Sequence, residues 1–419
     1  MSHASARTAS SLPLWHGVWW ACGLALGAAV SLGIARFAYG VLLPPMRADL
    51  GWSYLLAGAM NTANAVGYLV GAMSVPALMR RWGPSAVLLA GSVGASLLMA
   101  AGGSLTSEVA WLMQRALAGV VSAWMFVAGG LLAARVGNVW PRHAGLVLGL
   151  YYGGVGGGIV VSALMVPALL AWVGQRPHAW GWAWWGLALA CTVATVGLAA
   201  TLRALAIRGV TRGAATATST SDVAGSGGQG RMGVVPLLRA FAPSLLGYAL
   251  FGVGYIGYMT FVIALLRDRG TPAGEITLFY ALLGAAVLAS SRLWAGLLDR
   301  YRDGQPLARL NALLGVATVL PALTHAWPAL LASGLLFGSV FLSVVASTTA
   351  LVRHNLPPER WAAGISAFTV VFAVGQIAGP SVVGWIGDGP GGLERGLVFS
   401  ALALWLGALA AWRQRALTP

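Results

Sequence analysis

Twelve long apolar segments follow one another along the 419-residue chain, and they constrain its fold more than any other feature. Each is about as long as the 20 residues that a helix needs to cross a hydrocarbon layer of roughly 30 Å. Only 8% of the residues are charged, whereas a soluble globular domain has about 25%. We therefore expect an all-α polytopic membrane protein with twelve transmembrane helices. The expected spans are 18–43, 54–79, 84–104, 109–134, 145–172, 180–203, 237–266, 276–298, 307–324, 329–352, 363–387 and 395–412.

The arginines indicate how the chain is oriented, because most of them lie at the ends of these spans. All 25 basic residues are arginine. With the N-terminus in the cytoplasm, seventeen arginines fall on the cytoplasmic side and five on the other, as the positive-inside rule requires. We therefore attribute the net charge of +15 to topology and expect no nucleic-acid partner. Both termini are expected in the cytoplasm. The absence of lysine is typical of a GC-rich bacterial genome, which predicts a location in the inner (plasma) membrane. We also expect a monomer.

One stretch, Gly209–Val235, differs from the spans in composition and divides the chain. It is rich in glycine, serine and threonine, which is typical of a flexible linker. We predict an N-terminal six-helix bundle at 1–203, a cytoplasmic linker at 204–236 and a C-terminal six-helix bundle at 237–419.

The two halves share a weak internal repeat. An offset of 219 residues pairs Gly33 with Gly252, Arg36 with Tyr255, Tyr39 with Tyr258, Arg81 with Arg300, Gly119 with Gly338, and Gly145 with Gly364. Parallel repeats joined by a linker are one plan of secondary transporters, whose substrate site lies between the repeats near the bilayer midplane. The offset therefore favours two related bundles.

Three motifs resemble those of the major facilitator superfamily. The loop after the eighth span reads Gly296-Leu-Leu-Asp299-Arg300, and the fourth span carries Arg115-x-x-x-Gly119. The segment from Gly33 to Met46 is similar to the first helix of the YbfB/YjiJ-type branch. The resemblance covers the whole chain and implies two six-helix bundles, transport by alternating access, and a central cavity lined by helices one and four.

The same resemblance implies gating residues. It assigns Asp299 and Arg300 to a cytoplasmic gate latch, with Arg81 at the corresponding place in the first half. The first-half loop departs from the motif, because Arg80 stands where an Asp is usual and Pro76 where a glycine is usual. The charge-relay role of that Asp is therefore not carried over to the first half. The alternative is that these are ordinary loop charges.

Two arginines lie within cavity-lining spans. Arg36 is eight residues before Pro44, which we expect to end the first span, and Arg115 is about six residues into the fourth. At about 1.5 Å of rise per residue, both would lie roughly 9–12 Å below the outer surface. Guanidinium groups bind carboxylate or phosphate bidentately, so the pair predicts an organic-anion site. The alternative is that Arg115 bonds backbone carbonyls and Arg36 reaches outward. A third arginine, Arg292, is near enough to a span end to reach the interface.

Helical spacing adds further substrate-binding candidates. Tyr39 lies one turn from Arg36, and Asn61 and Asn64 share a face of the second span. In the second half, Tyr255 replaces Arg36 and Gln376 is the amide of the eleventh span. Polar stripes of this kind also stabilise contacts between helices, so that alternative stays open for each residue.

Several function classes are disfavoured by the residues that the spans lack. Without lysine, the chain has no Walker A loop and no Schiff-base residue. The ten carboxylates and six histidines fall in loops or at span edges, which leaves no catalytic or metal cluster within the membrane, so we expect no enzyme, metal or cofactor. The main prediction is transport of a small organic anion by secondary active or facilitative transport. The alternative is an exporter of neutral or hydrophobic compounds, which would use the aromatic side chains.

A glycine-rich run in the fifth span is expected to serve helix packing. Gly145, Gly149, Gly153 and Gly157 recur every four residues, which predicts a smooth face for close helix approach. Because the run lies within an apolar span and not between a strand and a helix, we do not interpret it as a nucleotide-binding loop.

Overall fold

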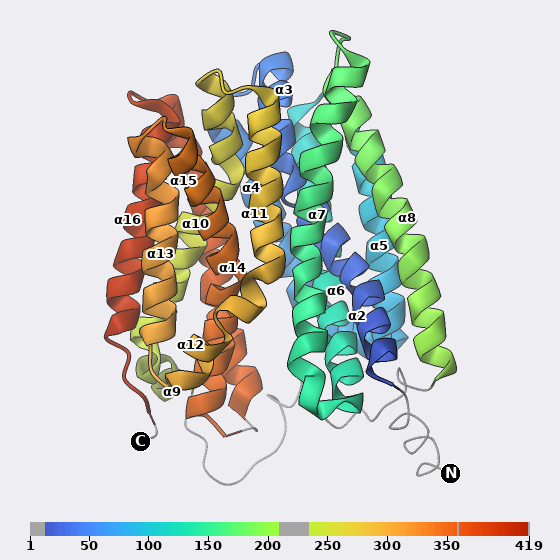
Figure 1. The fold of residues 1–419 in the computed structure, drawn as a ribbon, viewed down its shortest axis with the longest axis vertical. Helices are drawn as coiled ribbons and strands as arrows, with labels where there is room; N and C mark the ends of the chain where they lie inside the picture. Colours follow the sequence, from blue (N-terminus) through green and yellow to red (C-terminus); the bar gives the residue numbers. More distant parts are fainter. Residues whose placement is uncertain (1–12, 209–233, 358–359, 418–419) are drawn as a thin grey trace. The chain divides into compact units, whose positions relative to one another are not determined.

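The computed structural model describes residues 13–208, 234–357 and 360–417, and within these ranges the chain is helical, with no strand (Figure 1). Twelve of its helical segments are long and apolar enough to cross a membrane, which confirms the predicted number. The first half contains α2 (Leu14–Ala28), the π-helical segment η1 (Ala29–Ile34), α3 (Ala38–Leu50), α4 (Tyr54–Trp82), α5 (Pro84–Gly102), α6 (Glu108–Val139), the short 3-10 turn η2 (Pro141–His143), α7 (Ala144–Val173) and α8 (Ala179–Ile207).

The second half repeats this plan. It contains α9 (Val234–Ala240), α10 (Ala242–Asp268), α11 (Ala273–Leu293), α12 (Ala295–Arg300), α13 (Gln305–Leu323), α14 (Trp327–Asn355), α15 (Trp361–Asp388) and α16 (Gly392–Trp412). Most of the predicted linker, residues 209–233, lies outside the described residues, and the bundle limits 1–203 and 237–419 stay a prediction.

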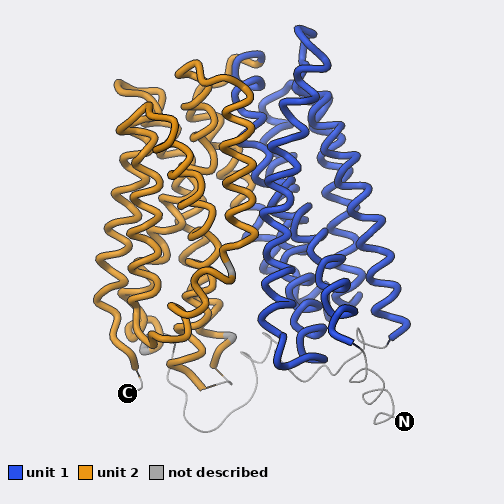
Figure 2. The backbone as a smooth tube through the Cα atoms, in the orientation of Figure 1, with its two compact units in different colours: residues 1–49, 67–217 blue, residues 50–66, 218–419 orange. Residues whose placement is uncertain are grey.

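The chain forms two compact units, and one helix belongs to both (Figure 2). Unit 1 comprises residues 1–49 and 67–217, and unit 2 comprises residues 50–66 and 218–419. The division falls inside α4, so that residues 54–66 of this helix pack within unit 2 and the remainder packs within unit 1.

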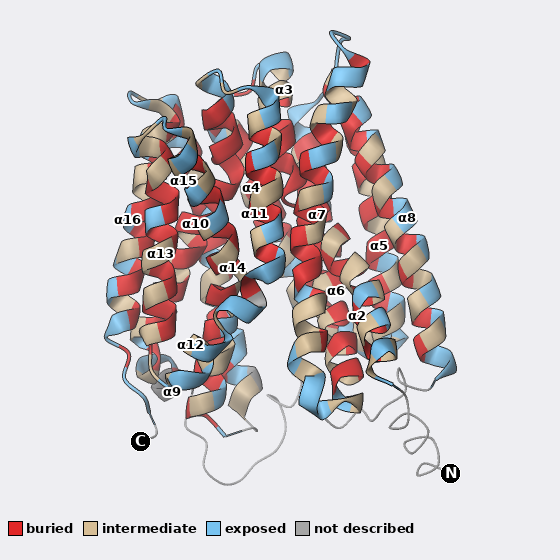
Figure 3. Ribbon diagram, in the orientation of Figure 1, coloured by how far each residue is buried: buried red, intermediate tan, exposed pale blue. Residues whose placement is uncertain are grey.

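The membrane helices differ in how much of their surface is buried within a unit (Figure 3). Of the most apolar 18-residue stretch of α10, 83% is buried, whereas the corresponding share in α8 is 33%. Large apolar side chains of α8 are left exposed, among them Leu189, Val193 and Val196. A soluble monomer rarely exposes an apolar surface of this kind, so we assign the outer face of α8 to lipid contact.

The first membrane segment is not a regular helix. Its hydrogen bonds lengthen to i→i−5 in the π-helical segment, where Ala35 N–H donates to Val30 at 2.9 Å and Phe37 N–H to Leu32 at 3.0 Å. A short turn at 35–37 follows, and α3 then continues through Pro44 and Pro45 to Leu50. The prediction that Pro44 ends this span is therefore wrong. Membrane helices tolerate internal proline where neighbouring groups satisfy the freed carbonyls, and here the break in the helix lies at residues 35–37, before both prolines.

The same glycine contact recurs at repeat-related positions of the two units. In unit 1, a Cβ added to Gly33 would lie 2.6 Å from the Cα of Gly158 on α7. In unit 2, a Cβ added to Gly252 on α10 would lie 3.2 Å from the Cα of Gly375 on α15. Both helix pairs thus approach so closely that they leave no room for a side chain, as the 219-residue offset predicts for Gly33 and Gly252.

Candidate functional site

In unit 1, the polar residues predicted for the substrate site gather around the irregular part of the first membrane segment. Arg36 is 4% exposed and lies in the turn between the π-helical segment and α3, while Arg115 on α6 is 0% exposed. The guanidinium carbon of Arg115 is 4.8 Å from the ring centroid of Tyr39, and that of Arg36 is 5.6 Å from the ring centroid of Tyr68. We call Arg36, Tyr39, Tyr68 and Arg115 the arginine cluster.

Arg115 also binds the backbone at the irregular turn of the first membrane segment. Its Nη1 donates to the carbonyl oxygen of Ala35 at 2.8 Å, and Nη2 lies 3.5 Å from that of Arg36. Two helical turns farther along α6, Ser122 Oγ donates to the carbonyl of Ser31 at 2.8 Å. Carbonyl groups at an irregular turn need donors from outside the helix, and α6 supplies them. This geometry fits the backbone-binding role that the sequence left open for Arg115.

In unit 2, the predicted candidates Tyr255 and Gln376 are joined by a hydrogen bond. The hydroxyl of Tyr255 on α10 donates to Oε1 of Gln376 on α15 at 2.6 Å, and both side chains are buried. Two residues predicted separately, from the repeat and from the polarity of a span, therefore belong to one place in the fold.

Tyr255 is part of a stack of aromatic rings that the sequence pattern did not reveal. The rings of Tyr248, Phe251, Tyr255, Phe341 and Phe372 form an aromatic array from α10, α14 and α15. Within it, Phe251 and Tyr255 are 4.8 Å apart, Tyr255 and Phe341 are 5.2 Å apart, and Phe251 and Phe372 are 5.4 Å apart, between ring centroids. These three pairs are inclined by only 13–21°. The available signal was the spacing of 248, 251 and 255, which places these residues on one face of a helix.

The two asparagines of α4 lie in the part of that helix that packs within unit 2. Asn61 is 5% exposed and Asn64 is 0% exposed. Nδ2 of Asn61 donates to Oγ1 of Thr260 on α10 at 2.7 Å. The structure therefore groups Asn61 with α10, and it groups Arg36, Tyr39 and Arg115 in unit 1.

The predicted gating residues are all exposed. Asp299 and Arg300 lie on the short helix α12, and Arg81 lies at the end of α4. The guanidinium of Arg300 is 5.7 Å from the ring centroid of Tyr301. A gate role for Arg81, Asp299 and Arg300 stays a prediction.

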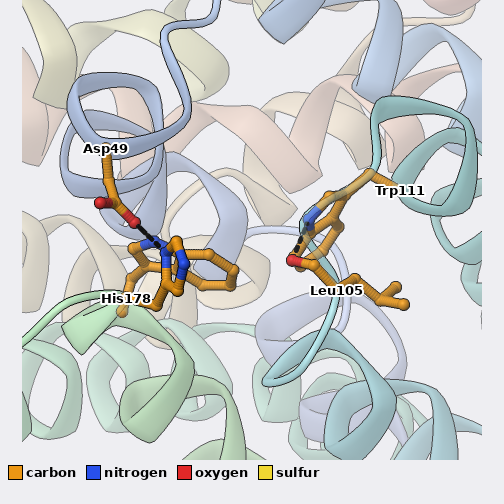
Figure 4. A network of polar contacts seen from close by, with 5 residues as sticks. Asp49, Leu105, Trp111 and His178 are labelled. Carbon is orange, nitrogen blue, oxygen red and sulfur yellow. Dashed lines mark hydrogen bonds and ion pairs between the residues drawn. The ribbon is translucent and has the colours of Figure 1, made fainter.

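A polar network joins the end of α3 to the start of α8 (Figure 4). Oδ2 of Asp49 is 2.5 Å from Nδ1 of His178 and accepts a hydrogen bond from the indole N–H of Trp180 at 2.5 Å. The neighbouring Trp111 donates to the carbonyl of Leu105 at 2.9 Å. Among the described residues, no group of three or more His, Cys, Asp or Glu side chains could hold a metal ion. The contacts of Asp49 with His178 and Trp180 connect the end of α3 with the start of α8, so we assign this network to stabilising helix ends.

Known proteins similar to this chain include a resistance protein and several transporters. A chloramphenicol resistance protein of Streptomyces lividans is 27% identical over 358 residues, which cover 85% of this chain and 86% of that protein. Three solved structures share the fold of this chain. The first is an inward-facing, unoccupied bacterial homologue of the human lysosomal transporter Spinster, with a TM-score of 0.68 and 15% identity, covering 95% of this chain and 96% of that one. The second is the nucleoside transporter NupG, with a TM-score of 0.68 and 14% identity, covering 96% of this chain and 99% of that one. The third is the outward-facing transporter FucP, with a TM-score of 0.60 and 15% identity, covering 96% of this chain and 99% of that one.

The family assignment rests on a match along nearly the whole chain. The family model described as "Uncharacterised MFS-type transporter YbfB" matches residues 28–412. The chain therefore belongs to this family of major facilitator superfamily transporters, with twelve membrane-crossing helices and a small-molecule substrate.

Proposed function

We propose that the protein exports small, largely apolar compounds that carry an aromatic ring. The observation that carries this proposal is the aromatic array of unit 2. Its rings lie nearly parallel, the arrangement in which a further flat ring can stack. Phe372 is the partly exposed member, whereas the other four rings are at most 3% exposed. Beside the array, the Tyr255–Gln376 hydrogen bond supplies polar groups that can fix the orientation of a bound solute. The resistance function in the name of the Streptomyces relative supports outward transport of such a compound.

Replacing single rings of the array tests this function. We expect Phe341→Leu and Phe372→Leu each to raise the KM for chloramphenicol transport into proteoliposomes by about 2–10-fold, because an aromatic pair contributes roughly 0.5–1.5 kcal/mol beyond its buried area. Leucine keeps the site apolar and removes only the ring. The matched control is Phe279→Leu, which alters a buried ring of α11 outside the array. Equal effects of all three variants would contradict a binding role for the array.

A second function, transport of a small organic anion, is favoured by the arginine cluster. Arg36 and Arg115 bring two cationic groups into the buried part of unit 1, where an anionic substrate would balance their charge. Tyr39 and Tyr68 lie against them and can donate further hydrogen bonds. The structure-forming role of Arg115 leaves Arg36 as the better candidate for a ligand.

Arg36→Gln tests the anion function. If Arg36 binds the substrate, we expect this variant to lose at least about ten-fold in uptake of benzoate or succinate, because a hydrogen bond to a charged group contributes about 1.5–3 kcal/mol. Transport of a neutral solute should change little. Arg292→Gln is the matched control, since Arg292 is an exposed arginine of α11. Unchanged anion kinetics in Arg36→Gln would exclude a ligand role for Arg36.

A further inference from the structure

We propose that unit 2 binds a phospholipid with a zwitterionic headgroup, of the phosphatidylethanolamine type, where α15 ends and α16 begins. The place is a cavity of about 340 Å³ that is lined by Trp385, Ile386, Asp388, Gly389, Pro390 and Arg395. All of these residues belong to unit 2. The inference concerns a lipid and not the transported solute, so it does not depend on the proposed function.

The cavity lies where a membrane-crossing helix reaches the membrane surface. Trp385 is in the last turn of α15, and its side chain is 68% exposed. Tryptophan is enriched at the level of the lipid headgroups, because its ring is apolar and its N–H group is polar. An exposed Trp385 at the end of a span is therefore placed to contact lipid at the height of the headgroup.

A tight turn brings the start of α16 back to the end of α15. Gly391 and Gly392 have φ angles of +88° and +55°, which glycine adopts without the steric cost that other residues meet. A Cβ added to Gly391 would collide with Nε of Arg395. Glycine at position 391 therefore leaves room for the side chain of Arg395, which lies back over the turn and lines the cavity.

Asp388 brings a negative charge to the cavity. Its two carboxylate oxygens accept hydrogen bonds from the backbone N–H groups of Tyr54 at 2.7 Å and Leu55 at 2.8 Å. These donors are neutral, so they do not balance the charge of the carboxylate. An ionised carboxylate has about four lone-pair sites, so Asp388 can accept a further hydrogen bond from a cationic ligand.

Arg395 brings a positive charge to the same cavity. Its side chain is exposed, and within the part of the chain that the structure describes it forms no ion pair. The neighbouring carboxylate, Glu394, binds Arg269 at 2.7 Å instead. The guanidinium group of Arg395 is therefore available to a ligand from outside the chain.

The charges and the apolar wall of the cavity together match a zwitterionic phospholipid. A guanidinium group binds phosphate through two parallel hydrogen bonds, and the ammonium group of ethanolamine can donate to Asp388. The indole face of Trp385 attracts a cation, while Ile386 and Pro390 favour the apolar part of the lipid. Phosphatidylglycerol would offer the same phosphate but no ammonium group.

Native mass spectrometry of the full-length protein, purified in detergent, tests the site. With equal amounts of phosphatidylethanolamine and phosphatidylglycerol of the same acyl chains, we expect phosphatidylethanolamine to be the first lipid bound. Arg395→Gln should lower its occupancy at least about five-fold, because a charge-assisted hydrogen bond is lost. The matched control is Arg176→Gln, at an exposed arginine of unit 1 that is predicted for the same side of the membrane. Equal binding of the two lipids, or equal occupancy in the two variants, would overturn the proposal.

A pair of tryptophan variants tests the contact at the headgroup level. We expect Trp385→Leu to lower the occupancy of phosphatidylethanolamine about two- to five-fold, since leucine keeps the surface apolar but removes the ring that attracts the ammonium group. Trp172→Leu alters an equally exposed tryptophan of unit 1 and should have no such effect. The same occupancy in both variants would contradict the contact with Trp385.

Asp388→Asn distinguishes recognition of the ammonium group from recognition of the phosphate. The variant keeps one acceptor for the start of α4 and removes the charge, so we expect it to retain a lipid without preferring phosphatidylethanolamine. An unchanged preference would overturn the zwitterionic headgroup. Glycerophosphoethanolamine, the soluble headgroup, should not displace the lipid even in large excess. Displacement by this compound would assign the cavity to a soluble ligand and overturn the lipid site.

Discussion

Replacing Arg115 by Gln is expected to lower the stability of the protein and to abolish transport of every solute, charged or neutral. Arg115 is fully buried and donates to the carbonyl of Ala35, with a longer contact to that of Arg36. Glutamine is too short to reach both carbonyls. A buried polar group left without its partner costs about 1–3 kcal/mol, and here the loss falls where the first membrane segment is irregular. The thermal transition of the detergent-purified variant, measured beside transport, checks this result.

Measurements on two further variants distinguish a structural role of Arg115 from a role in substrate binding. Arg115→Lys keeps the charge but presents a point donor in place of a planar fork, so we expect it to recover part of the stability. Arg292→Gln again serves as the control. If Arg115→Gln keeps its thermal stability and loses only anion transport, Arg115 is a ligand and the structural interpretation fails.

The spans, and the buried polar residues that make up part of the candidate site, could be predicted from the sequence because both depend on local composition. A helix that crosses a bilayer must satisfy its backbone polar groups internally and present apolar side chains, so its sequence alone marks it. Polar residues within such a span are costly, and Arg36, Arg115 and Gln376 therefore stand out from the apolar residues around them. The repeat offset also paired Gly33 with Gly252, and each of these glycines makes an equivalent close helix contact in its own unit.

The remaining features depend on contacts between distant segments, which leave no local pattern. Pro44 suggested the end of a helix, yet the regular hydrogen bonding stops at residues 35–37, where α6 provides donors to the carbonyls. Asp388 at the end of α15 resembles any span-edge carboxylate until the start of α4 is placed beside it. The aromatic array likewise combines three helices, so the sequence showed its parts without showing that the rings stack.

The glycine face of α7 shows how a small error in register arises. The sequence suggested contact through Gly145, Gly149, Gly153 and Gly157, but an added Cβ at Gly145 or Gly157 would meet no atom within 4 Å. Gly154 and Gly158 make the contact with α2 and η1. Successive residues of a helix with 3.6 residues per turn differ by about 100°, and a four-residue step overshoots each turn by about 40°. Over the three steps from Gly145 to Gly157 the stripe therefore rotates by about 120°, so its four members cannot all face one neighbour. The single step from Gly154 to Gly158 keeps both glycines on the same contact.

Gly33→Ala is expected to destabilise the protein strongly and to displace Arg36 with it. The added Cβ would lie 2.5 Å from the carbonyl oxygen of Val155 and 2.6 Å from the Cα of Gly158, so that only a backbone shift can accommodate it. Overpacking of this kind typically costs about 1–3 kcal/mol. Because Arg36 follows three residues later, the shift should also move the arginine cluster, and transport should fall together with the thermal transition temperature.

Gly157→Ala is the matched control for this effect, because it adds the same methyl group to α7 where it meets nothing. Alanine favours a helix over glycine by about 1 kcal/mol, so the control should be neutral or slightly stabilising. The contrast separates packing from helix propensity, since both variants replace glycine by alanine in a helical segment. Equal transition temperatures for Gly33→Ala and Gly157→Ala would mean that α7 yields to the added methyl group. The close contact between η1 and α7 would then not be what holds Arg36 in place.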